Sequence, residues 1–523
     1  MLVTDCKSGI YHVGGSEYVS RVQLAAAILS HVKGHNATIA PTPTSALSQA
    51  APRPLRGGLV GLRLQAEYPL FTFRTAGRFL ADAKKKAARQ PKALPGLYAQ
   101  YDKPGKHWYA PNKFEAYGEE EIAAVEECLR DGFLAPGPRT EQFEASVASL
   151  FAKKCALMVN SGSSANLIAL NAFGFKPGDE VVTAACTFST VIAPLVQLGV
   201  KPIFVDVVRE TYVPSTDVII NAITPKTVMI WLPNLIGSKP DWAEIRRRAP
   251  GGIALYEDAC DTIDETPQSD VSITSFYASH MITAGGGGGM IMANDKAYID
   301  KCRMYRDWGR IGNNSEDLAD RFGSSIDGIA YDGKFLYGVI GYNMKSTEMN
   351  AAFGNVQLTK LPRFREIRRA NFERFLDNLR GTSYGLPAEP HGHKCHWMAF
   401  PLLSKHRNQI LRWLEGNNIQ TRVTFVGVNM LACARLLASP NSQIIAQPKA
   451  GNILRHPAYR SNTDYFEQQG GGTRFPAADA IMAEGFLLGC HHGTTFAQID
   501  RACELLKEFE KTYGSQGYKY KLG

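Results

Sequence analysis

Three short stretches of this sequence carry side chains that could together bind and use a charged organic ligand. His280 ends the stretch 275–280 and can take up or release a proton near neutral pH. Asp258 follows the apolar run 253–256, and its carboxylate could keep a ligand's ring nitrogen protonated. The Ser-Gly stretch 160–166 could present N–H groups and hydroxyls to a phosphate. Each also has a structural interpretation: a buried, hydrogen-bonded histidine, a surface acid and a helix cap, respectively.

From residue 111 onward, strand-like runs alternate with helix-like runs. The runs predicted as strands are 155–159, 180–184, 202–207, 228–232 and 253–256. An amphipathic helix is predicted over 119–129, with Ile122, Val125, Cys128 and Leu129 on one face. This alternation predicts an α/β fold with a mainly parallel sheet covered by helices. Asp258 would then stand at the carboxyl end of a strand, where α/β proteins bind ligands.

The composition is that of an ordinary globular protein. The chain has 523 residues, of which 45% are hydrophobic and 20% charged, and a formal charge of +9. That mild positive charge suits phosphorylated or nucleotide-linked substrates, and no basic-aromatic module indicates a nucleic-acid partner. The ten cysteines form no C-x-x-C pair, which argues against a zinc ribbon or a disulfide framework. Without a signal sequence or a membrane-length apolar run, we expect a cytoplasmic protein with no membrane partner.

Three more side chains could complete a ligand site. Phe188 could stack on an aromatic ring, although a phenylalanine is more often packed in a core. Ser275 could donate a hydrogen bond to a phosphate. Asn343, in the turn-rich stretch 341–345, could reach a phosphate in the same or in a neighbouring subunit.

These stretches, in this order, resemble the DegT/DnrJ family of pyridoxal-phosphate sugar aminotransferases and their dehydratase relatives. The resemblance covers about 115–510 and includes the stretches 137–139 and 177–181. It implies fold-type I, the aspartate aminotransferase-like α/β architecture, with a smaller carboxyl-terminal α+β domain. It also implies the cofactor site: Gly162, Ser163 and Ser275 on the phosphate, Phe188 on the ring and Asp258 on the ring nitrogen, with Asn343 as a further phosphate contact. Family enzymes build each site at a dimer interface, so a homodimer is expected.

His280 stands where most of the family carries a lysine bonded to the cofactor, and a histidine there is similar to the nucleotide-sugar 3-dehydratases. Such enzymes use pyridoxamine phosphate to remove the C3 hydroxyl of a nucleotide-linked 4-keto-6-deoxyhexose, in deoxysugar and lipopolysaccharide O-antigen biosynthesis. By resemblance, His280 would be the base and an amino donor such as glutamate would regenerate the cofactor. Arg422, His491 and His492 are candidates for the substrate pocket. A sugar aminotransferase and a non-catalytic homologue remain the alternatives.

One branch of these dehydratases also holds an iron–sulfur cluster, and the stretches 306–310 and 341–345 are similar to that branch. There, closely spaced cysteines follow the first stretch, whereas this chain has Ile-Gly-Asn-Asn-Ser at 311–315. Cys260 could match one ligand position, but a cluster normally needs about four ligands. We therefore predict no iron–sulfur cluster and no other metal.

The expected domains are a reductase-like segment at 1–85, a linker at 86–110, a large cofactor-binding domain at 111–362 and a small domain at 363–523. The first segment resembles a truncated carboxyl-terminal part of dTDP-4-dehydrorhamnose reductases. It lacks their glycine-rich turn and Tyr-x-x-x-Lys pair, so it cannot work as a reductase. An insertion is expected at 428–450, and the glycine run 285–289 is expected to form a flexible loop after His280.

Overall fold

The computed structural model describes residues 105–111, 116–311, 317–424 and 475–513. The chain divides into two compact units, 1–104 and 105–523, and the described residues all belong to the second. The reductase-like segment 1–85 and the insertion 428–450 lie outside the described residues. In the described part, no helix is both long and apolar enough to cross a membrane.

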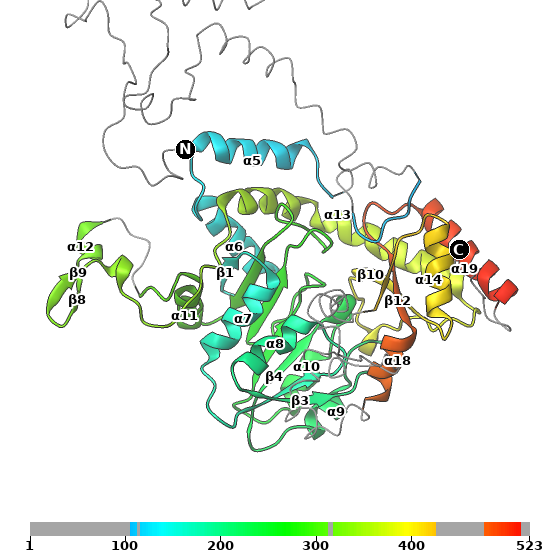
Figure 1. Ribbon diagram of the computed structural model, residues 1–523, viewed down its shortest axis with the longest axis horizontal. Helices are drawn as coiled ribbons and strands as arrows, with labels where there is room; N and C mark the ends of the chain where they lie inside the picture. Colours follow the sequence, from blue (N-terminus) through cyan, green and yellow to red (C-terminus); the bar gives the residue numbers. More distant parts are fainter. Residues whose placement is uncertain (1–104, 112–115, 312–316, 425–474, 514–523) are drawn as a thin grey trace, which may run out of the picture. The chain divides into compact units, whose positions relative to one another are not determined.

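A seven-stranded sheet forms the centre of the large domain (Figure 1). Its strands lie in the order β1 (Cys155–Val159), β7 (Gly289–Ala293), β6 (Val271–Ser275), β5 (Ala254–Asp258), β4 (Thr227–Pro233), β2 (Glu180–Ala184) and β3 (Lys201–Val205). All neighbours pair in parallel except β7, which is antiparallel to both β1 and β6. The mainly parallel sheet is thus confirmed, and the five predicted strands are present.

Helices pack on this sheet and bury its strands, which explains why several strands read as continuous apolar runs. The helices of the large domain are α6 (Pro138–Leu150), α7 (Gly162–Phe173), α8 (Ser189–Gln197), α9 (Thr216–Asn221), α10 (Trp242–Arg248) and α11 (Lys296–Arg306), with the 3-10 turn η3 (Leu235–Gly237). Trp231 of β4 is fully buried, and its indole N–H donates to the carbonyl of Val191 in α8 at 2.7 Å.

The helix predicted over 119–129 is α5 (Glu119–Asp131), but only part of its predicted apolar face is buried: Cys128 packs, whereas Ile122 and Leu129 do not. Glu121 and Cys128 are buried, whereas Ile122 and Leu129 are 40% and 53% exposed. The Glu121 carboxylate instead accepts from Gln357, at 2.7 Å, and pairs with Lys360 of the long helix α13. Polar bonds therefore seat α5, and much of its apolar face is left open in the single chain.

The helix expected over 350–361 is part of α13 (Glu348–Leu379), which has 32 residues and crosses the expected domain boundary. Pro362 lies inside it and removes one backbone hydrogen bond. Apolar residues on both sides of Pro362 are buried in the core, including Leu361 and Phe372. That burial is enough to keep the helix continuous, so a single element belongs to both domains.

The small domain contains a three-stranded antiparallel sheet in the order β10 (Ala399–Leu403), β12 (Gly485–Gly489) and β11 (Thr421–Val423). Its helices are α14 (Arg407–Gly416), α18 (Pro476–Glu484) and α19 (Phe496–Tyr513), and the 3-10 turn η5 (Pro390–Gly392) precedes β10. Residues 105–110, placed at the end of the expected linker, pack on this sheet. The buried ring of His107 bonds to the carbonyl of Gly489 at 2.8 Å, so this piece is part of the folded body.

A projecting segment, residues 317–340, is called the arm below. It contains α12 (Leu318–Arg321), the hairpin β8 (Ser324–Ile326) and β9 (Ile329–Tyr331), and the 3-10 turn η4 (Gly333–Phe335). The arm stands away from the sheet, at the left of Figure 1. Several of its large apolar side chains are exposed, among them Ile329 at 67% and Ile340 at 95%.

Candidate functional site

Three of the predicted cofactor residues, Gly162, Asp258 and Ser275, lie at the carboxyl ends of strands of the sheet. β1 leads into Gly162, β5 ends at Asp258 and β6 ends at Ser275. A methyl group added at Gly162 would lie 2.7 Å from both the Cys260 Sγ and the Ser275 Cβ. The sheet therefore brings Gly162 together with Ser275, which lies 113 positions further along the sequence.

The amino terminus of α7 forms a cradle of the kind that binds phosphate. Ser161 caps the helix, and its Oγ accepts from the Ser164 N–H at 3.1 Å. The exposed Ser163 hydroxyl lies 3.1 Å from that of Thr190 in α8. Helix N–H groups and the partial positive charge of the helix end favour an anion here. Gly162 has to be a glycine because the adjoining strand ends fill the space of a side chain.

Asp258 is a buried carboxylate held by neutral donors. Its Oδ2 accepts from the Asn166 amide at 2.7 Å and its Oδ1 from the Cys260 N–H at 2.9 Å. Within the described ranges, no cation pairs with it, and burial raises the pKa of Asp258 despite these bonds. A protonated ring nitrogen would supply the missing cation, so the residue fits the role that was predicted for it.

His280 is placed as an unprotonated base. Its Nδ1 lies 3.3 Å from the carbonyl oxygen of Ser275, which can only accept, so Nδ1 carries the ring proton and Nε2 keeps its lone pair. Burial lowers the pKa of His280 to about 4, and the nearby Arg368 contributes to the decrease. At neutral pH the ring is therefore uncharged and ready to accept a proton.

Two residues that the sequence patterns did not indicate belong to the surroundings of the site: Asp261 lies beside His280, and Tyr109 lies near Asp261. The Asp261 Oδ1 is 3.9 Å from the His280 Nε2, and its Oδ2 accepts from the Ile236 N–H at 2.8 Å. Burial and the charge of Asp258 raise the pKa of Asp261 to about 7. Tyr109 is the second: burial and the charge of Asp261 raise its pKa. An acid three residues after Asp258 was a usable signal for Asp261, whereas Tyr109 lay in the expected linker.

Phe188 and Asn343 border this group with exposed side chains. Phe188 precedes α8 by one residue, and Thr190 of that helix contacts both Ser163 and Asn166. The stretch 341–345 runs beside the end of β1, because the Asn160 N–H donates to the Met344 carbonyl at 2.9 Å. Their contacts with a ring and a phosphate remain predictions.

The substrate-pocket candidates have different surroundings. Arg422 on β11 is exposed, and its guanidinium lies 5.2 Å from the Tyr109 ring centre. The buried His491 bonds through Nε2 to the Trp108 carbonyl at 3.1 Å, which holds the segment 105–111 on the small domain. The His492 ring stacks on the Phe364 ring, with the two ring centres 3.6 Å apart. Their roles toward a substrate remain predictions.

The glycine run 285–289 is tied to the cradle. Gly285, Gly286 and Gly288 adopt positive φ angles of 69°, 94° and 122°, which favour glycine. The Gly288 N–H donates to the Asn160 carbonyl at 3.0 Å, and a Cβ at Gly289 would lie 2.4 Å from the Ser161 backbone. The glycines thus serve a bonded turn with a close backbone approach, where a flexible loop was expected.

No group of three or more His, Cys, Asp and Glu side chains in the described ranges is arranged to hold a metal ion. Cys260 contacts the cradle, and residues 312–316 lie outside the description. The absence of an iron–sulfur cluster remains a prediction.

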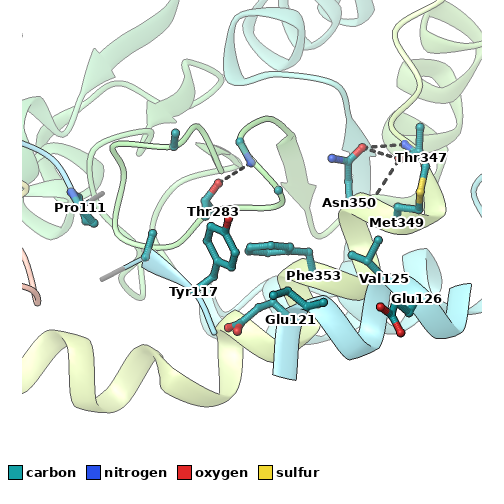
Figure 2. A pocket seen from close by; sticks show the side chains of 15 residues that line it. Pro111, Tyr117, Glu121, Val125, Glu126, Thr283, Thr347, Met349, Asn350 and Phe353 are labelled. Carbon is teal, nitrogen blue, oxygen red and sulfur yellow. Dashed lines mark hydrogen bonds between the residues drawn. The ribbon is translucent and has the colours of Figure 1, made fainter. Parts of the chain in front are cut away.

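A separate cavity of about 640 Å³ lies between α5, α13 and the turn at Gly285 (Figure 2). In its lining the rings of Tyr117 and Phe353 lie next to one another, edge to face, with ring centres 5.4 Å apart. Its lining includes Ala278 and Gly286 from the loop around His280, but none of the predicted cofactor residues.

Comparison with known proteins gives concordant results. A family model described as the DegT/DnrJ/EryC1/StrS aminotransferase family matches residues 115–447. The lipopolysaccharide biosynthesis protein RfbH of Salmonella typhimurium is 30% identical over 430 residues, which are 76% of this chain and 91% of that protein. The dTDP-4-dehydro-2,6-dideoxy-D-glucose 3-dehydratase of Saccharopolyspora spinosa is 32% identical over 430 residues, 75% of this chain and 84% of its own.

Among solved structures, the crystal structure of a GDP-4-keto-6-deoxymannose-3-dehydratase with a trapped PLP-glutamate geminal diamine is similar, with a TM-score of 0.62. The identity is 25%, and the match covers 76% of this chain and 100% of that chain. The likeness confirms the fold-type I architecture. The chain belongs to the DegT/DnrJ/EryC1/StrS aminotransferase family.

Proposed function

We propose that this protein is a pyridoxamine-phosphate-dependent 3-dehydratase that acts on a nucleotide-linked 4-keto-6-deoxyhexose. The observation that carries the proposal is His280: an uncharged histidine with a free Nε2 stands beside a phosphate cradle and a buried carboxylate. A lysine at this place would favour an aminotransferase, because it could bond the cofactor covalently. The relatives named above, which include dehydratases of dTDP- and GDP-linked sugars, support the same choice.

The residues present fit the cofactor. The α7 terminus with Gly162, Ser163 and Ser275 would hold its phosphate, Asp258 its ring nitrogen, and Phe188 its ring face. When bound, the cofactor supplies an amine for the sugar ketone and a ring that accepts electrons. Glutamate is the proposed amino donor, since the solved relative was trapped with a glutamate adduct of pyridoxal phosphate.

The protein's own part in the reaction is proton transfer and positioning. His280 Nε2 would take the proton that has to leave before the C3 hydroxyl departs, because its low pKa keeps it unprotonated. Asp261, at 3.9 Å, would stabilise the imidazolium formed in that step, and its second oxygen is fixed by the Ile236 N–H. Arg422 and the Tyr109 ring would border the sugar on the side of the small domain.

We also propose that the active form is a homodimer. The arm exposes Ile329 and Ile340, and α5 exposes Leu129 and Ile122, of which Ile122 also lines the cavity of Figure 2. Exposed apolar groups on this scale are typical of interaction surfaces. A second copy would cover them and could bring its own arm to the rim of the site.

The test is turnover. The protein, loaded with pyridoxamine phosphate and supplied with glutamate, is given GDP-4-keto-6-deoxymannose and, separately, its dTDP-linked counterpart, and ammonia and 3-deoxy sugar are measured. We expect His280→Asn to bind the cofactor but to lose activity by a factor of about 100 or more. His406→Asn is the control, because that ring contacts Gln409 in the small domain. A stable 4-amino sugar as product would favour an aminotransferase, and lack of cofactor binding would indicate a non-catalytic homologue.

A further inference from the structure

We propose that Arg368 is a positioning residue that fixes the His280 backbone and keeps the His280 ring unprotonated with its positive charge. The proposal rests on the function proposed above, in which His280 is the base. It assigns a role to a buried cation that the reaction does not otherwise use.

Arg368 is a buried guanidinium bonded to carbonyl oxygens. It lies on α13 with 1% of its surface exposed. One terminal nitrogen donates to the Met398 carbonyl at 2.8 Å and the other to the His280 carbonyl at 3.3 Å, while Nε has no partner. Among the described residues no carboxylate pairs with it, whereas the next residue, Arg369, pairs with Glu373 and Glu389. Burying an unpaired charge is costly, so this arrangement suggests a functional reason.

The two charged groups around His280 act in opposite directions on its protonation. Arg368 faces it from α13, and its charge, after burial, lowers the pKa of both His280 and His491. Asp261 faces it from the loop after β5 and, if ionised, would favour the protonated ring. Burial raises the pKa of Asp261 to about 7, so this carboxyl is largely neutral at the pH where the ring would take a proton. The Tyr277 ring also faces the His280 ring, with the two ring centres 6.0 Å apart.

Arg368 also closes a chain of hydrogen bonds around the base. It links the His280 carbonyl to that of Met398, and the Met398 N–H donates to the Ile236 carbonyl at 2.8 Å. The Ile236 N–H in turn binds Asp261, the acid beside the His280 Nε2. The chain passes from the large domain through α13 and the small domain and back. Arg368 therefore supports both sides of the base, the backbone and the neighbouring acid.

The experiment follows the His280 ring by NMR in the cofactor-free protein, with labelled histidines and with His280→Asn to identify the signal. Arg368→Gln removes the charge but keeps a donor, Arg368→Lys keeps the charge, and Arg369→Gln is the matched control. We expect the His280 pKa to lie well below 6.5 in the wild type, to rise by about 1 in Arg368→Gln, and to stay low in Arg368→Lys and Arg369→Gln. The acidic limb of the kcat profile should move to higher pH in Arg368→Gln alone.

An unchanged His280 pKa in a folded Arg368→Gln protein would overturn the proposal. If Arg368→Gln does not fold, the His280 pKa values of the wild type, Arg368→Lys and Arg369→Gln test the proposal. A wild-type His280 pKa at or above 6.5 would overturn the proposal, as would a rise of about 1 in Arg368→Lys, which keeps the charge. A pKa that stays low in the wild type, in Arg368→Lys and in Arg369→Gln would support it. Because the titration is read without turnover, a failure of the proposed dehydratase activity would be seen separately.

Discussion

Gly162→Ala should damage both the stability of the protein and its binding of the cofactor phosphate. The new methyl group would lie 2.7 Å from the Cys260 Sγ and from the Ser275 Cβ, well inside van der Waals contact. Overpacking of this kind costs about 1–3 kcal/mol. The greater helix preference of alanine works in the opposite direction by at most about 1 kcal/mol. A net loss of up to about 2 kcal/mol in the free energy of unfolding is therefore expected when the full helix preference is gained.

The assay compares denaturant unfolding of the cofactor-free protein with a titration of pyridoxamine phosphate followed by absorbance. Gly251→Ala is the matched control, because a Cβ there would meet nothing within 4 Å. The cofactor dissociation constant of Gly162→Ala should rise about tenfold or more, which corresponds to about 1.4 kcal/mol. Adding Cys260→Ala should restore part of both losses, because it removes one of the two clashing atoms. Cofactor affinity and stability equal to those of Gly251→Ala would refute the cradle.

Two further outcomes follow from the site and the surface. Asp261→Asn should become more stable relative to the wild type as pH rises from 5 to 8. Burial raises the pKa of Asp261 in the folded state to about 7, above the ordinary 3.8, so over most of this range the folded protein holds a proton that the unfolded chain has released. The wild type therefore loses stability as pH rises, and the asparagine variant does not. Urea unfolding at both pH values measures this, and a gain that is larger at pH 5 would contradict it. Ile340→Asp in the arm should raise the dissociation constant of the proposed homodimer about tenfold or more, measured by light scattering. Val218→Asp on α9, where the side chain is 39% exposed, is the control and should leave it unchanged. Equal effects of the two changes would show that the arm is not part of the interface.

Most of the strands that were predicted contain short apolar runs, but β7 (Gly-Met-Ile-Met-Ala) is such a run as well and was not among them. β6 escaped because its sequence alternates polar and apolar residues, yet all five residues are buried. Its Ser272 and Thr274 hydroxyls bond to the buried Glu257 and to the Ala259 carbonyl, so polar residues are satisfied inside the core. A local pattern cannot show partners that arrive from a neighbouring strand.

The candidate site divides in the same way. The strand-end rule placed Asp258 from the sequence, whereas Ser275 and His280 follow β6, which was not predicted, and were grouped with Asp258 by their resemblance to the family. Arg368 resembles the other cations of its basic helix, and only the fold shows that it is buried while Arg369 is paired near the surface. Tyr109 reaches Asp261 across about 150 positions of sequence. Contacts over such distances depend on tertiary structure alone.

The continuity of α13 bears on how this enzyme could open and close. Its 32 residues form a rod of about 48 Å that belongs to both domains, so the boundary at Pro362 is not a joint. At its first turn the buried Glu348 carboxylate accepts from Gly137, Arg139 and Thr140, which anchors the rod to the start of α6. Entry of a substrate would then rely on movement of loops or of a neighbouring subunit, because the two domains would move together as one rigid body. A truncation at 362 would divide α13 and leave neither piece with a complete core.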